Sequence, residues 1–232
     1  MSFYRFVRME AEKTTHLYIE GVMEAQRPWW MEDGEVCCPE DFRAALMAAG
    51  NDRVIVHVNS PGGDVTAGIA IFEMLRQRSG ETRCEVTFAA SAASLIPCAI
   101  SKPNCLISPA GMVMIHNPSM IAYGDESEME RAKAALKAWK QAAIGAYRER
   151  IDKTDDEIAA LMSQEVFLPA KEAVELGICD AIMQKPAELG ASMYYRQAVM
   201  TAESNSLAHM IRHVQETSEA KEREELLAFA KS

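Results

Sequence analysis

The sequence has few basic residues relative to its acidic ones. Its 232 residues include 24 lysines and arginines against 34 aspartates and glutamates, which gives a formal net charge of -10 at pH 7. No long stretch is rich in lysine and arginine. Proteins that bind nucleic acid without sequence specificity neutralise phosphates with clusters of such residues. The composition therefore argues against a nucleic-acid partner.

The chain also lacks the marks of secreted and membrane-bound proteins. Residues 1–8 contain no uninterrupted apolar core of the signal-peptide type. The longest apolar stretch, residues 88–100, contains Pro97 and is shorter than the roughly 20 residues of a membrane span. The cysteines form no C-x-x-C pair. We expect a soluble, cytoplasmic protein with no membrane partner and with reduced, buried cysteines. These are Cys37, Cys38, Cys84, Cys98, Cys105 and Cys179.

What the sequence does contain is the rhythm of an α/β domain. The apolar fraction is 49 % and the charged fraction 25 %, both typical of globular chains. Strand-like runs alternate with helical patterns, which favours a sheet covered by helices. Strands are predicted over 16–22, 53–58, 84–88, 105–107, 112–115 and 178–183. Helices are predicted over 39–49, 66–77, from 91, over 126–152, from 155, and in the segment that ends at Gly177.

A long helix and a C-terminal tail complete the predicted organisation. The helix at 126–152 is rich in alanine, so it can project from the domain and pack against a second copy; an ordinary surface helix fits its pattern equally well. Beyond residue 185 the composition shifts to Met, Gln, Ser, Glu and Lys. We expect one domain at 1–186 and a charged tail at 187–232 that is helical or partly disordered.

Two serines compete for the role of a nucleophile. The run A-A-S-A-A-S at 89–94 lies where a strand gives way to a helical pattern. There Ser91 can expose its hydroxyl beside the unpaired N–H groups of the helix. Ser94 lies about one helical turn further along, which places it deeper in the fold.

Two further segments have the residue types that such a serine needs. N-S-P-G-G at 59–63 follows a strand, and its glycines permit a close backbone approach, although a simple turn capped by Asp64 fits equally well. M-I-H-N-P at 114–118 places His116 at the end of an apolar strand, before a turn. The other histidines lie in strand-like runs or in the tail: His16, His57, His209 and His213.

Together and in this order, the three segments resemble the proteolytic subunit of the Clp protease, and more closely the phage ClpP-like head maturation proteases. Gly62 precedes Ser91 by 29 positions and Ser91 precedes His116 by 25, which is similar to the family's spacing. The resemblance covers about residues 17–183. It implies a spiral of ββα units, shared with crotonase-like enzymes, and a long helix that projects after the histidine.

The resemblance also implies roles for the matching residues. Ser91 would be the nucleophile and His116 the general base. The N–H groups of Gly62 and Ala92, with Gly63 as a further donor, would form the oxyanion hole. An extended substrate would add as a strand beside Gly62 and Gly63 and beside the stretch after the histidine, Asn117 and Pro118.

The third member of the triad departs from the family pattern. Glu165 stands where the family has an aspartate, and a glutamate can still stabilise the imidazolium. Asp155, Asp156 and Asp180 are alternatives, and Glu165 could instead be an ordinary solvated acid.

The implied function is that of a serine endopeptidase that acts through an acyl-enzyme, without ATP, metal or organic cofactor. The substrates would be polypeptides, capsid or scaffold proteins among them, and the enzyme a ring-like homo-oligomer. Three rival functions stay open: a degradative subunit served by an ATP-driven unfoldase, an acyl-CoA hydratase or isomerase, and a non-enzymatic scaffold protein with a vestigial site.

Overall fold

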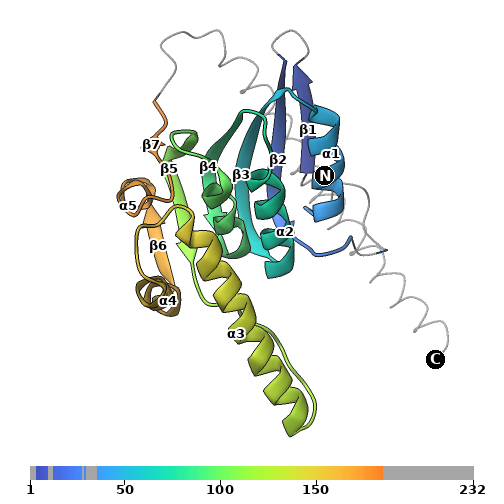
Figure 1. The fold of residues 1–232 in the computed structure, drawn as a ribbon, viewed down its shortest axis with the longest axis vertical. Coiled ribbons are helices and arrows are strands. Elements are labelled where there is room, and N and C mark those ends of the chain that lie inside the picture. The colour runs from blue at the N-terminus through green and yellow to red at the C-terminus, as the bar shows by residue number, and fades with distance from the viewer. Residues whose placement is uncertain (1–3, 10–12, 28, 30–35, 185–232) are drawn as a thin grey trace, which may run out of the picture. The chain divides into compact units, whose positions relative to one another are not determined.

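A computed structural model describes residues 4–9, 13–27, 29 and 36–184 of the chain (Figure 1). The predicted tail at 187–232 lies outside the described residues, so its structure stays a prediction. Within the described part, no helix is both long and apolar enough to cross a membrane.

A seven-stranded sheet forms the centre of the fold. Its order is β1 (Tyr4–Met9), β2 (Thr14–Met23), β3 (Arg53–Gly63), β4 (Thr82–Ala90), β5 (Cys105–Ile115) and β6 (Val166–Pro169), and the short β7 (Ala181–Ile182) pairs with β5. Strands β2 to β5 are parallel neighbours, whereas β1 and β6 are antiparallel to theirs. The predicted α/β class is confirmed.

Helices α1 (Pro39–Ala49) and α2 (Val65–Arg76) pack on one face of this sheet (Figure 1). Burial alternates along β3, so that Val56 and Val58 enter the same core as Phe42 of α1 and Ile71 of α2. The caps of both helices agree with their sequence, since Pro39 opens α1 and the Asp64 side chain caps α2.

The long helix α3 (Glu126–Arg148) begins where the sequence predicts and ends four residues earlier than expected. Its last turns are buried through Ala143, Ile144, Ala146 and Tyr147, while its first half is mostly exposed. The exposed half extends beyond the edge of the sheet (Figure 1). Helices α4 (Asp155–Gln164) and α5 (Ala170–Glu175) follow it, separated by β6.

Several predicted elements differ in the structure. The segment from Ser91 forms two short 3₁₀ helices, η2 (Ser91–Leu95) and η3 (Pro97–Ala99), because Pro97 cannot donate the hydrogen bond that a continuous α-helix needs. The two strands expected at 105–107 and 112–115 are one strand, β5, with an irregularity in its pairing to β4. Strand β1 was not predicted from the sequence, and the residues of β6 were predicted as part of a helix.

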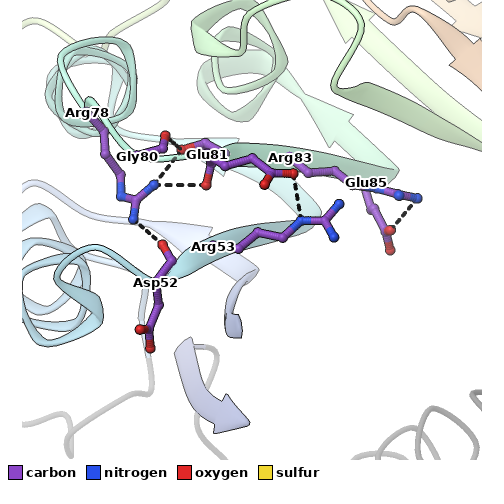
Figure 2. Close-up of polar contacts among 8 residues, drawn as sticks. Asp52, Arg53, Arg78, Gly80, Glu81, Arg83 and Glu85 are labelled. Atoms are coloured by element: carbon purple, nitrogen blue, oxygen red, sulfur yellow. Dashed lines mark hydrogen bonds and ion pairs between the residues drawn. The ribbon is translucent and has the colours of Figure 1, made fainter. Parts of the chain in front are cut away.

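The amino ends of β3 and β4 are held by polar contacts (Figure 2). Arg78 donates to the carbonyl oxygens of Glu81 at 2.9 Å and Gly50 at 3.1 Å, and also to that of Asp52. Arg53 Nε lies 2.9 Å from Glu81 Oε1. These hydrogen bonds and this ion pair join the amino ends of the two strands. Ser91 and His116 follow the opposite, carboxyl ends of β4 and β5.

Candidate active site

Three segments far apart in the chain meet at one edge of the sheet. Gly63 ends β3, Ser91 directly follows β4, and His116 directly follows β5. Because these strands are adjacent and parallel, their carboxyl ends lie side by side. The structure therefore brings together the three motifs that the sequence singles out.

A short hydrogen bond joins the candidate nucleophile to the candidate base. His116 Nε2 lies 2.6 Å from Ser91 Oγ, and both residues are half-buried. Ser91 has a φ of 54°, a left-handed conformation that is uncommon for a residue with a Cβ. Such a turn at the end of a strand resembles the nucleophile elbow of the α/β-hydrolases, where strain holds the hydroxyl in an exposed position.

The competing serine is engaged elsewhere. Ser94 is fully buried, and its Oγ donates to the Ser91 carbonyl oxygen at 2.5 Å and lies 2.7 Å from the Tyr147 hydroxyl. Burial raises the pKa of Tyr147, so this phenol stays protonated and neutral. Ser94 therefore links η2 to α3 and supports the turn that carries Ser91.

Gly62 packs directly beneath the serine turn. It has a φ of 87°, and a Cβ at this position would lie 2.8 Å from both Ser91 Cβ and the Ala92 nitrogen. No side chain fits there, so glycine is required by contact as well as by conformation.

The Gly62 N–H donates to Ser60 Oγ at 3.1 Å, and Ser60 Oγ in turn donates to the Gly21 carbonyl oxygen at 2.5 Å. The oxyanion role expected of Gly62 stays a prediction. The neighbouring Gly63 lines the cavity beside Ser91, together with Ala92.

This cavity has a volume of about 220 Å³ and contains both Ser91 and His116 in its wall. Trp139, Ala143 and Tyr147 of α3 form part of the wall, and Pro118 lines it as expected. The side chain of Asn117 instead turns to α4, where its Nδ2 donates to Ser163 Oγ at 3.2 Å. The contribution of α3 to this cavity was not predicted from the sequence. Its three lining residues are spaced by four positions, which places them on one side of a helix.

A sequence profile of the Clp protease family matches residues 43–186, which is more than half of the chain. The chain belongs to the Clp protease family. It is also 30% identical, over 133 residues, to an ATP-dependent Clp protease proteolytic subunit from Chlorella vulgaris. That alignment covers 57% of this chain and 66% of the relative, so the chain spans just under two thirds of the relative's length.

Glu165 is the residue that the resemblance to the Clp protease family implies as the third member of the triad. The antiparallel pairing of β5 and β6 ends with Ile115 opposite Val166, so His116 and Glu165 each lie next to the last paired residue of their strand. Glu165 is exposed and ends α4 in a left-handed conformation, with a φ of 53°. Among the contacts of the described residues, no hydrogen bond joins its carboxylate to His116.

The alternative acids have other partners. Asp180 accepts a hydrogen bond from the Cys105 N–H at 2.8 Å and forms an ion pair of 2.8 Å with the buried Arg150. Asp155 pairs with Arg148 at 2.8 Å on the surface. Asp180 and Asp155 thus have structural ion-pair partners, Arg150 and Arg148. Asp156 lies in the exposed first turn of α4, at the opposite end of that helix from Glu165.

The other reactive residue types are structural in this fold. His16 Nδ1 and His57 Nε2 lie 2.9 Å apart in the sheet, between β2 and β3. All six cysteines are free and buried, as expected, and burial raises the pKa of Cys37 and Cys98 to about 12. Among the described residues, no group of three or more His, Cys, Asp or Glu is arranged to hold a metal ion.

Proposed function

We propose that the protein is a serine peptidase that cleaves polypeptides through an acyl-enzyme. The observation that carries this proposal is the 2.6 Å hydrogen bond between His116 Nε2 and Ser91 Oγ, with Ser91 on a strained turn at the wall of a cavity. Family membership supports the same reaction class.

In the proposed reaction, His116 Nε2 takes the proton of the Ser91 hydroxyl as its oxygen attacks the peptide carbonyl carbon. The tetrahedral intermediate then collapses, the C–N bond breaks, and the imidazolium gives the proton to the departing amine. A water molecule, deprotonated by the same imidazole, hydrolyses the ester and restores the serine. Ser91 and His116 thus carry both halves of the reaction.

We propose that the N–H groups of Gly62 and Ala92, with Gly63 as a further donor, form the oxyanion hole. Ala92 and Gly63 line the cavity, Ala92 directly follows the nucleophile, and Gly62 packs against the serine turn. A substrate carbonyl bound there would lie in an extended peptide beside Gly63 and Pro118.

Covalent labelling tests the proposal. A fluorophosphonate probe reacts only with a serine whose hydroxyl is activated by a base. We expect one adduct per chain, which tryptic mass spectrometry should locate on Ser91. Labelling of Ser94 in place of Ser91, or no labelling of the folded protein, would contradict the proposed site. A hydratase or a vestigial scaffold protein would likewise remain unlabelled.

We propose that Glu165 orients His116 during turnover. Two observations support this role: Glu165 and His116 each lie next to the last residue pair of β5 and β6, and the Glu165 side chain is exposed. Replacing Glu165 by glutamine should lower kcat by about 10²–10⁴-fold and leave KM nearly unchanged, because a neutral amide cannot stabilise the imidazolium. The matched control is Glu172→Gln, an exposed acid on α5. An unaffected kcat in Glu165→Gln would move the role to another group.

We propose further that the chain assembles into a ring-like homo-oligomer through α3. Its exposed half, and the apolar Ile121 and Tyr123 that precede it with exposed fractions of 99% and 96%, support an interface there. Light scattering that detects only monomer would contradict this.

The narrower biological role is also a proposal. The sequence resemblance to phage enzymes favours processing of capsid or scaffold proteins in a cytoplasmic setting, without ATP. The relative from Chlorella is named as an ATP-dependent subunit, which favours the alternative of a degradative partner for an unfoldase. Cleavage of a folded protein by the isolated enzyme, with no ATPase present, would support the first role over the second.

A further inference from the structure

One acidic side chain lies in the wall of the cavity that contains Ser91. Asp64 lines this space with Val65, Leu95, Trp139 and Tyr147. No lysine or arginine of the described chain shares the wall. Lys140, which follows Trp139 in α3, has its Nζ 3.3 Å from Ser163 Oγ. Apart from His116, the cavity therefore has a single charged group, and that group is negative.

The Asp64 carboxylate is held in place by one of its two oxygens. Oδ1 accepts hydrogen bonds from the Thr66 N–H at 2.7 Å, from the Ala67 N–H at 3.0 Å, and from the Thr66 hydroxyl. These bonds cap α2 and fix the side chain. Among the described residues, none donates a hydrogen bond to Oδ2. The cap thus leaves one carboxylate oxygen available to a ligand.

The rest of the wall suits a long aliphatic stem. Val65 and Leu95 are apolar, and Trp139 and Tyr147 present aromatic rings. Lysine and arginine bury their methylene groups against such surfaces while the charged end binds a carboxylate, and aromatic faces also attract cations. An uncharged apolar side chain would remove water from Asp64 without replacing its hydrogen bonds. A glutamate or aspartate would be repelled.

We propose that Asp64 makes the enzyme selective for lysine or arginine at the residue whose carbonyl carbon Ser91 attacks. This inference rests on the proposed peptidase function and names its substrate class. In this proposal the side chain of that residue occupies the cavity whose wall contains Asp64, Val65 and Leu95. The net charge of -10 also attracts basic polypeptides over longer distances.

The test uses fluorogenic peptides that differ only at this residue: lysine, arginine, norleucine and glutamate. Norleucine reproduces the lysine stem without its ammonium group. For the wild-type protein, kcat/KM for lysine should exceed that for norleucine by at least about 10-fold, the contribution of one charge-assisted hydrogen bond, and glutamate should be the poorest substrate.

The decisive variant is Asp64→Asn. Asparagine caps helices as well as aspartate does, so the fold and the start of α2 are retained while the charge is removed. The lysine-to-norleucine ratio of kcat/KM should fall by about 10-fold or more. Asp152→Asn, which removes an exposed charge between α3 and α4, should leave the ratio unchanged.

Fluorophosphonate labelling of the wild-type protein separates the two proposals, because it does not depend on a peptide side chain. If Ser91 is labelled, three results would overturn the selectivity and leave the nucleophile intact. These are faster cleavage after norleucine than after lysine, no cleavage of any peptide, and an unchanged lysine-to-norleucine ratio in Asp64→Asn. No labelling and no cleavage would overturn both.

Discussion

Replacing Gly62 by alanine should lower the melting temperature by about 5–15 °C and abolish peptidase activity. The added methyl group would lie 2.8 Å from Ser91 Cβ and from the Ala92 nitrogen, in a backbone conformation with a φ of 87°. Backbone strain of about 1–3 kcal/mol and overpacking of about 1–3 kcal/mol combine to a loss of roughly 2–6 kcal/mol in the free energy of unfolding. Thermal unfolding followed by circular dichroism measures the first effect, and peptide cleavage the second.

Gly50 supplies a matched control. It also has a positive φ, 52°, but a Cβ there would meet no atom within 4 Å. Gly50→Ala should therefore cost only the backbone strain and retain full activity. If Gly62→Ala melted like Gly50→Ala and still cleaved peptides, the close packing between Gly62 and the serine turn would not be needed for catalysis.

The elements that the sequence predicts well are those with strong local signals. Helix α1 has the predicted bounds because Pro39 opens it and Gly50 follows its end, and α3 begins at Glu126 behind the cap Asp125. The roles of Ser91 and His116 were implied by the resemblance that three motifs carry. The structure places their side chains 2.6 Å apart, and their catalytic roles stay a proposal.

What the sequence could not predict depends on contacts between distant segments. The hydrogen bond from the Gly62 N–H to Ser60 Oγ, and the close packing of Gly62 against the serine turn, are visible only in the three-dimensional structure. The helix expected over part of 165–177 contains β6, because pairing with β5 overrides the local helical pattern. The same pairing joins Ile115 and Val166, the neighbours of His116 and Glu165, and the role of Glu165 stays a proposal.

Replacing Ser91 by alanine should reduce kcat by about 10⁴–10⁶-fold without loss of stability. The variant removes the atom that forms the acyl-enzyme, so only binding and the oxyanion donors remain to accelerate hydrolysis. Alanine also fits the site, because the Ser91 side chain has no buried hydrogen-bond partner other than His116 among the described residues. Burst-phase kinetics with an ester substrate should lose the burst entirely.

Ser94→Ala is the matched control in the same 3₁₀ helix. It leaves the buried Tyr147 hydroxyl without its 2.7 Å partner, which should cost about 1–3 kcal/mol of stability, and it should retain the acylation burst. The two variants thus separate a catalytic role from a structural one. Ser91→Ala should lose turnover at full stability, and Ser94→Ala should lose stability while the nucleophile still reacts. Loss of the burst in Ser94→Ala, with a retained burst in Ser91→Ala, would assign the nucleophile to Ser94. A burst that survives in both variants would exclude the whole η2 segment, and the nucleophile would have to lie elsewhere in the cavity wall, where Ser119 has the remaining serine hydroxyl.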